Sequence, residues 1–206
     1  MISSQIGVLD KIFSGGLKNG TITEISGLRG TGKTQLALQF GIQPLSNNEK
    51  ILFVDTTVEF RPERFLQMIK SRNLSIDLLE NLQISRVTNT QEQLEILNNL
   101  PKQDFSLLII DNITDLFAFE YTKREHSIEK NNSFANFMMK LSKISLLQNI
   151  PIIITNQTLQ TDNSNYQRMY MQLEKIKNDF SCKITSPFIH DTKFNYKITN
   201  SGIEET

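Results

Sequence analysis

Residues 27–34 read Gly27-Leu28-Arg29-Gly30-Thr31-Gly32-Lys33-Thr34, a full match to the phosphate-loop pattern G-x-x-x-x-G-K-[ST]. The match lies between an apolar segment, Thr21–Ser26, that predicts a strand and a run that predicts a helix from about Lys33. Glycines here let the backbone turn tightly, so that successive N–H groups face an anion, and the start of the helix adds partial positive charge. The segment therefore predicts a phosphate-binding loop between a strand and a helix.

The side chains of this loop predict ATP and Mg²⁺ as ligands. Lys33 is expected to reach the β- and γ-phosphates and so to act in catalysis, and the hydroxyl of Thr34 is expected to bind Mg²⁺. The remaining loop residues and Gln35, which follows them, are expected to contact the nucleotide.

A phosphate loop also needs a carboxylate at the end of a neighbouring strand to orient the water shell of Mg²⁺. Asp111 closes the apolar run Phe105–Asp111 and is the preferred candidate, although a strand-terminal Asp also commonly caps the next turn. Asp55 ends another apolar run and is the alternative. Gln157 follows the apolar run Pro151–Thr155 and is a candidate γ-phosphate sensor, the other interpretation being a solvated loop.

Short apolar runs alternate with longer amphipathic segments along most of the chain, which predicts one α/β domain with a mostly parallel central sheet. The phosphate loop adds the P-loop NTPase class, in which helices flank this sheet. Tyr121–Asn132 is expected to be an exposed loop or a helix start. Strands are expected at Thr21–Ser26, Ile51–Asp55, Leu82–Arg86, Phe105–Asp111, Pro151–Thr155, Ser181–Thr185 and Lys193–Thr199, and helices from about Lys33 and at Pro62–Arg72, Thr90–Leu100, Ser133–Gln148 and near Met169–Lys177.

Composition excludes several classes of protein. The chain has 206 residues with 22 Lys+Arg against 22 Asp+Glu, so it does not bind polyanions by bulk basicity alone. Its single cysteine, Cys182, excludes a disulfide framework, and its two histidines, His126 and His190, are too few and too isolated for a metal cluster. Because no segment has the apolar length of a membrane span or the features of a signal peptide, we expect a cytoplasmic protein without membrane partners.

Several segments in order resemble the ATPase core of the RecA/RadA recombinase superfamily. Leu9, Asp10, Gly15 and Gly16 match an L-D-x-x-x-x-G-G pattern ahead of the phosphate loop. Further matches are Phe53–Thr56, Phe60–Arg64, Leu107–Asp111, Ile150–Gln157, Ser186-Pro187 and Phe194–Gly202. The chain is most similar to the short archaeal RadB-type paralogues, since it begins directly at the ATPase core. The resemblance implies a single RecA-like domain over residues 1–206, without a separate N-terminal DNA-binding domain.

Two departures from the family pattern bear on mechanism. The family's D-T-E motif supplies the glutamate that polarises the attacking water, and here Thr57 stands at its position, with Glu59 as the nearest carboxylate. The family's aspartate before Ser-Pro is replaced by Thr185. Both departures imply weak or absent hydrolysis and no conventional filament. Arg64 matches a residue that packs near the adenine in relatives, the other interpretation being an exposed helix arginine.

The resemblance implies a role in DNA repair and homologous recombination, with single-stranded DNA and the full-length recombinase, or a second copy, as partners. One family DNA-binding loop would lie in Thr158–Gln167, and the second is short or absent. A basic and aromatic set next to it is interrupted by Glu174 and Asp179, so a solvated mixed-charge face is the competing interpretation. This set is Tyr166, Arg168, Tyr170, Lys175, Lys177 and Lys183.

Three functions follow from these residues. The first is a repair paralogue that binds Mg²⁺-ATP and hydrolyses it weakly. The second is a DNA-stimulated ATPase in which Glu59 replaces the base missing at Thr57. The third is a nucleotide-stabilised interaction module that grips the main recombinase through an exposed apolar patch at Phe117–Tyr121. A signalling ATPase of the same superfamily is a more distant alternative.

Overall fold

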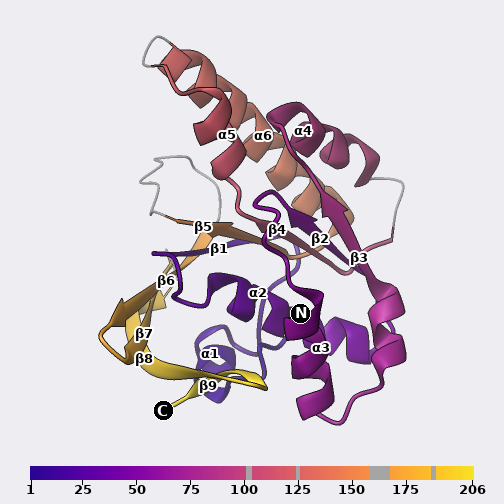
Figure 1. Ribbon diagram of the computed structural model, residues 1–206, viewed down its shortest axis with the longest axis vertical. Helices are drawn as coiled ribbons and strands as arrows, with labels where there is room; N and C mark the ends of the chain where they lie inside the picture. The colour runs from indigo at the N-terminus through magenta and orange to yellow at the C-terminus, as the bar shows by residue number, and fades with distance from the viewer. Residues whose placement is uncertain (101–103, 124–125, 158–167, 187–188) are drawn as a thin grey trace.

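The computed structural model describes residues 1–100, 104–123, 126–157, 168–186 and 189–206, and within these it forms one mixed sheet covered by helices on both faces (Figure 1). In the described residues the sheet has nine strands, in the order β3-β2-β4-β5-β1-β6-β7-β8-β9. From β3 to β6 in this order the strands run parallel, and β6 to β9 pair antiparallel. The α/β fold class with a mostly parallel sheet is therefore confirmed.

The strands are β1 Ile22–Gly27, β2 Ile51–Asp55, β3 Leu82–Arg86, β4 Leu107–Asp111, β5 Ile152–Asn156, β6 Arg168–Ile176, β7 Asp179–Ser186, β8 Ile189–Thr199 and β9 Gly202–Glu205. The helices are α1 Gly7–Ile12, α2 Lys33–Ser46, α3 Pro62–Ser71, the 3₁₀ helix η1 Ile76–Asn81, α4 Thr90–Asn99, α5 Asp115–Glu120 and α6 Ser127–Gln148. In Figure 1, α1, α2 and α3 lie on one side of the sheet and α4, α5 and α6 on the other.

The parallel strands are apolar on both faces because each face has its own core. In β4, Leu107 and Ile109 belong to the cluster under α2, whereas Leu108 and Ile110 belong to the cluster under α6. Because side chains alternate along a strand, a strand between two helix layers needs a continuous apolar run, which is the pattern that predicted β4.

The N-terminal segment is fixed by the Asp10 and Gly16 positions of the L-D-x-x-x-x-G-G pattern. The Asp10 carboxylate accepts hydrogen bonds from Ser4 N and Ser4 Oγ, both at 2.8 Å, and from Ser3 Oγ at 2.5 Å. A Cβ at Gly16, where φ is +132°, would lie 2.1 Å from the carbonyl oxygen of Ile2, so only glycine fits. The pattern is therefore structural and packs the segment against α2.

Buried Gln39 on α2 joins the two ends of the chain. Its Nε2 donates to the carbonyl oxygens of Ser4 at 3.1 Å and Ile203 at 3.0 Å, and its Oε1 accepts from Ile203 N at 2.6 Å. The last strand, β9, consequently lies over the helix that follows the phosphate loop. Because all of these polar atoms are paired, the buried amide carries little desolvation penalty.

Sequence patterns placed β2 and β3 correctly and the other parallel strands to within two residues, with the exception of β6. The helix expected near Met169–Lys177 is wrong, since this segment is β6, which pairs with β1 and β7. Met171 and Leu173 are two residues apart and both buried, and they pack with Cys182 and Ile184 of β7. Their period of two is that of a strand, and the interspersed charged residues mask it.

Four short elements were not predicted: α1, η1, α5 and β9. The segment Tyr121–Asn132 contains a helix start, because α6 begins at Ser127, six residues before the expected Ser133. Among the described residues no helix has the length and hydropathy to cross a bilayer.

Candidate nucleotide-binding site

The predicted phosphate loop connects β1 to α2, and three contacts define its conformation. Within the loop, Thr31 Oγ1 and Lys33 Nζ both donate to the carbonyl oxygen of Leu28, at 2.8 and 3.0 Å. At its start, Gly27 has φ +151°, and a Cβ there would lie 2.3 Å from the carbonyl oxygen of Leu173 on β6. The first glycine of the motif thus allows the close approach of a neighbouring strand.

The C-terminal antiparallel strands also support this loop. The buried hydroxyl of Tyr196 on β8 donates to the carbonyl oxygen of Thr31 at 2.6 Å. Burial raises the pKa of Tyr196, and the Cys182 thiol nearby acts in the same direction, so the hydroxyl stays protonated and remains a donor. The loop is therefore held from the C-terminal part of the sheet as well as by its own helix.

Asp111, at the carboxyl end of β4, faces the start of α2. One of its carboxylate oxygens accepts from Thr34 Oγ1 at 2.6 Å, and the other accepts from Thr155 Oγ1 of β5. Burial raises the pKa of Asp111, while the two hydroxyl donors and the charge of Lys33 oppose that rise. The structure thus brings together the two oxygen groups that the sequence predicted as magnesium ligands, Thr34 and Asp111.

Asp55, the alternative carboxylate, is occupied by its own loop. It accepts from Thr57 N at 3.1 Å, from Thr57 Oγ1 at 3.0 Å and from Phe60 N at 3.2 Å. Arg86 Nε on β3 lies 3.8 Å from its carboxylate. These bonds fit a residue that caps the turn after β2, which is the common use of a strand-terminal Asp.

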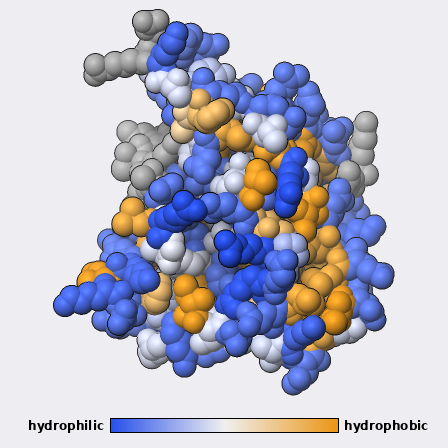
Figure 2. Space-filling view, in the orientation of Figure 1, coloured by the Kyte–Doolittle hydropathy of each residue, from blue (hydrophilic) through white to orange (hydrophobic). Residues whose placement is uncertain are grey.

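A cleft of about 820 Å³ lies along this edge of the sheet. It is lined by Arg29, Gly30 and Gly32 of the loop, by the start of α2 from Lys33 to Gln35, and by polar residues after β2, β4 and β5. Carboxyl ends of neighbouring parallel strands meet at one edge, which is where ligands bind in open α/β sheets. On the face shown in Figure 2, hydrophobic residues form several groups separated by hydrophilic ones.

Lys33 is the central cation of the cleft. Burial lowers its pKa, while Asp111, Asp115 and Glu59 nearby favour its charged form. Its ammonium group has one hydrogen-bond acceptor among the described residues, the carbonyl oxygen of Leu28. A half-buried ammonium with further donor capacity suits an anionic ligand.

Glu59 and Thr57 lie at the rim of the cleft. Arg29 Nη2 donates to Glu59 Oε1 at 2.5 Å, with the two side chains 82% and 60% exposed. The Thr57 hydroxyl donates to Asp55 and accepts from Glu59 N at 3.2 Å, so this position caps a turn. Glu59 thus lines the cleft and pairs with a phosphate-loop arginine, and its role as a base stays a prediction.

Arg64 reaches the cleft from the first turn of α3. Its Nε donates to Gln35 Oε1 at 2.6 Å, one of its terminal nitrogens donates to Gln67 Oε1 at 2.5 Å, and the other donates to the carbonyl oxygen of Thr199. These bonds join α2, α3 and the end of β8. Arg64 is therefore held in place, and its packing near an adenine stays a prediction.

Gln157 directly follows β5, lines the cleft and is exposed. The residue before it is fixed, since Asn156 Oδ1 accepts from Thr114 Oγ1 at 2.9 Å and Asn156 Nδ2 donates to Glu24 at 3.1 Å. The role of Gln157 as a γ-phosphate sensor stays a prediction. Cleft residues that the sequence analysis missed include Thr56, Asn112, Asp115, Phe119 and Ile198.

Residues predicted to face DNA are described only in part. The loop Thr158–Gln167, with Tyr166, lies outside the described residues, as do the side chains of Arg168 and Tyr170. Lys175 Nζ on β6 lies 5.1 Å from the centre of the Phe180 ring on β7. Lys193 Nζ on β8 lies 3.8 Å from Glu174 on β6, across the intervening strand β7. The described part of this face thus mixes charges, as the competing interpretation holds.

The expected apolar patch at Phe117–Tyr121 needs a correction. Phe117 is buried, with ring centres 5.3 Å from Phe134 and 5.9 Å from Phe137. Phe119, in contrast, is 77% exposed. Helix α5 places the ring of Phe117 in the core and the ring of Phe119 in solvent, because residues two apart lie on different faces of a helix. The exposed part of the segment is consequently smaller than predicted.

We predict that Asp111→Asn stabilises the protein without nucleotide. Burial raises the pKa of the Asp111 carboxylate, so its charged form destabilises the folded state. This loss of stability develops as the pH rises from the pKa of the group in the unfolded chain through its higher pKa in the folded protein. An asparagine keeps an acceptor for Thr34 and carries no charge. Thermal unfolding at neutral pH should show a higher Tm for the variant, and the difference should shrink in acid. A lower Tm at neutral pH would contradict the prediction.

Comparisons with known proteins agree with this geometry. The sequence profile of the Rad51 family matches residues 1–175. The chain is 27% identical over 230 residues to the DNA repair and recombination protein RadA of Ignicoccus hospitalis, which covers 96% of this chain and 70% of that protein.

Two further relatives extend this similarity. RadA of Methanococcus maripaludis is 25% identical over 236 residues, covering 96% of this chain and 73% of that protein. The DNA repair protein RAD51 homolog A of maize is 33% identical over 168 residues, covering 76% of this chain and 49% of that protein. The resemblance to the RecA/RadA superfamily is therefore confirmed, and the chain belongs to the Rad51 family.

Proposed function

We propose that this chain binds Mg²⁺-ATP, hydrolyses it weakly and assists DNA repair and homologous recombination as a paralogue of the main recombinase. The observation that carries the proposal is the contact between Thr34 and Asp111 beside Lys33, in a cleft where Thr57 replaces the expected glutamate. The first part supports nucleotide binding and the second supports slow turnover. The relatives that match are DNA repair proteins by name, which supports the pathway.

The donor set of the cleft fits a magnesium ion. A threonine hydroxyl and a carboxylate in contact are hard oxygen ligands, and Mg²⁺ combines few such protein ligands with waters and phosphate oxygens. Thr34 and Asp111 would hold the ion, which would help to neutralise charge that develops on the phosphates. Among the described residues no group of three or more His, Cys, Asp or Glu forms a metal site, so phosphate oxygens and waters would have to complete the shell.

The phosphates would lie along the loop. Backbone N–H groups of residues 28–34 and the ammonium of Lys33 would contact them, and Gln35 and Arg64 would lie towards the base. Gln157, at the end of β5, would sense the γ-phosphate. We propose these roles for the same residues that the sequence nominated, and Glu59 as a candidate base is tested separately below.

The finer assignments are part of the proposal. They are a RadB-type paralogue, a single RecA-like domain, and single-stranded DNA together with the main recombinase or a second copy as partners. The charge pattern supports DNA binding only modestly. The described Lys175 and Lys193 both have partners on the sheet, so their charges are partly engaged within the protein. Salt dependence of DNA binding would count the phosphate contacts involved.

One experiment tests the proposal directly. ATP binding by calorimetry, with and without Mg²⁺, is measured alongside steady-state hydrolysis across a titration of single-stranded DNA, with Lys33→Ala as the blank. We expect Mg²⁺-dependent binding, with slow turnover that lies measurably above the blank and is not stimulated by DNA. Rapid turnover stimulated by DNA would instead favour the DNA-stimulated ATPase. Absence of ATP binding would overturn the proposal.

The interaction module is the second candidate, and the exposure of Phe119 favours it. Phe119 protrudes from α5 at the edge of the nucleotide cleft, so a partner gripping it would also approach the nucleotide. Loss of binding to the main recombinase after Phe119→Ala, with ATP affinity intact, would support this function. Unchanged binding to the recombinase would exclude Phe119 as the contact.

A further inference from the structure

Three carboxylates of the described residues line the nucleotide cleft: Asp111, Glu59 and Asp115. The first two are engaged with the protein. Asp111 accepts from two threonine hydroxyls, and Glu59 is paired with Arg29 at the exposed rim. Asp115 has no hydrogen-bond or ion-pair partner within the part of the chain that the structure describes. Of the three carboxylates named, Asp115 is the one whose acceptor positions are open in the described part of the chain.

The position of Asp115 is set by the segment that precedes it in the chain, and not by hydrogen bonds of its own side chain. It is the first residue of α5, four residues after Asp111, at the same edge of the sheet as Gln157. Two hydrogen bonds fix the segment between β4 and α5. Asn112 N donates to Thr56 Oγ1 at 2.8 Å, and Thr114 Oγ1 donates to Asn156 Oδ1 at 2.9 Å. Asp115 thus has a fixed position between the ends of β4 and β5.

The surroundings of Asp115 are those of a proton acceptor. Its side chain is half-buried. Burial raises its pKa; Lys33 lowers it and Glu59 raises it further. A carboxylate near a phosphate-binding lysine, partly shielded from water and without a partner, can accept a hydrogen bond from a water molecule that faces the phosphates.

We propose that Asp115 is the catalytic base of this chain, replacing the carboxylate that Thr57 lacks. The inference rests on the proposed ATP-binding function. The oxygen of a water molecule forms a bond to the γ-phosphorus while the bond from that phosphorus to the bridging oxygen of ADP breaks. The electron pair of the broken bond stays on ADP, and a water proton passes to a carboxylate oxygen of Asp115 and then to solvent. The step consumes ATP and water and yields ADP and phosphate.

Asp115 and Glu59 make different predictions. Asp115→Asn keeps the size of the side chain and removes its basicity, so turnover should fall about 100-fold, or to the Lys33→Ala blank, as expected for loss of a general base. ATP affinity should change by less than about threefold, because the base contacts the water rather than the nucleotide. Glu59→Gln should lower turnover far less than Asp115→Asn does, because Glu59 is paired with Arg29 at the exposed rim. Glu95→Gln on α4, an exposed acid away from the cleft, is the matched control for loss of one negative charge.

The test uses the full chain with single-turnover hydrolysis of labelled ATP, calorimetric ATP binding and thermal unfolding for each variant. Loss of turnover in Asp115→Asn with a retained Kd and Tm supports the proposal. Turnover that survives in Asp115→Asn and disappears in Glu59→Gln overturns it in favour of Glu59. A wild-type protein that binds ATP and turns over no faster than the blank overturns it as well, while leaving the binding function standing. A wild-type protein that binds no ATP overturns the proposed function itself.

Discussion

Lys33→Ala should weaken ATP binding by about 10- to 150-fold. The lysine supplies a charge-assisted hydrogen bond to the phosphates, and such a bond contributes about 1.5–3 kcal/mol, which is that range in Kd. Without nucleotide the variant should remain folded, because burial already lowers the pKa of Lys33 and its one acceptor among the described residues is a loop carbonyl. The loss therefore falls on binding and not on the fold.

Ligand-induced stabilisation is a sensitive measurement of this loss. At an ATP concentration 100 times the wild-type Kd, bound nucleotide stabilises the folded state by about 2.7 kcal/mol, or about 5–10 °C in Tm for a chain of this size. A variant with 100-fold weaker affinity would gain about 0.4 kcal/mol under the same conditions. Lys143→Ala, an exposed lysine on α6, is the matched control and should show the full shift. An equal shift in Lys33→Ala would show that the loop does not bind the phosphates.

The parallel half of the sheet and the metal-binding pair could be predicted because their signals are local. A run such as Leu107–Asp111 is apolar throughout because it is buried on both faces, and it ends where the sheet ends. The glycine spacing of the phosphate loop reflects backbone conformation. Since the carboxyl ends of parallel strands share one edge, the contact between Thr34 and Asp111 follows from the order of the elements.

What the sequence did not predict depends on pairing between distant segments. Strand β6 is defined by its neighbours β1 and β7, and only their positions show that Met171 and Leu173 share a face. Asp115 was missed for a similar reason. No helix was predicted at its position, and an acid in the first turn of a helix is common because of the helix dipole, so its residue type indicated no site. Its place in the cleft depends on how the loop after β4 packs against β2 and β5.

The Glu59 prediction shows that nearness in sequence is a weak guide to which carboxylate can act in the cleft. Glu59 is the carboxylate nearest in sequence to Thr57, which made it the natural replacement. In the structure it lies at the rim, and its partner is an arginine of the phosphate loop. An exposed pair of this kind contributes little to stability, so it orders the rim only loosely. Proximity in sequence therefore selected a residue of the cleft without showing which carboxylate faces its interior.

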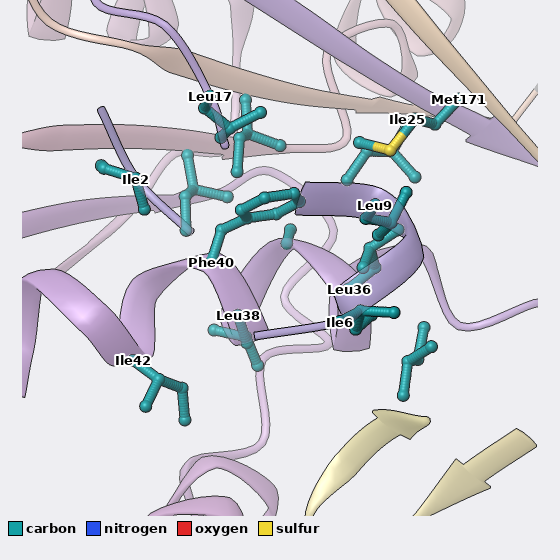
Figure 3. Packing of buried hydrophobic residues seen from close by; sticks show 14 of the residues in the cluster. Ile2, Ile6, Leu9, Leu17, Ile25, Leu36, Leu38, Phe40, Ile42 and Met171 are labelled. Carbon is teal, nitrogen blue, oxygen red and sulfur yellow. The ribbon is translucent and has the colours of Figure 1, made fainter. Parts of the chain in front are cut away.

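Phe40→Ala should destabilise the protein by about 3–5 kcal/mol, the usual cost of removing a phenylalanine from a close-packed core. Phe40 is fully buried on α2, and Figure 3 shows it among Leu9, Leu17 and Leu36 of the same cluster. The cluster is covered by α1 and by the N-terminal segment, which is fixed through Asp10. The surrounding side chains therefore cannot easily fill the cavity that removal of the Phe40 ring would leave. Phe119→Ala, where the ring is 77% exposed, is the matched control and should change the free energy of unfolding by less than about 0.5 kcal/mol. Urea unfolding of both variants measures the difference, and similar costs at the two positions would show that α2 is not the centre of this core. Because α2 begins at Lys33 and Thr34, the Phe40 variant should also bind ATP more weakly at temperatures where it begins to unfold.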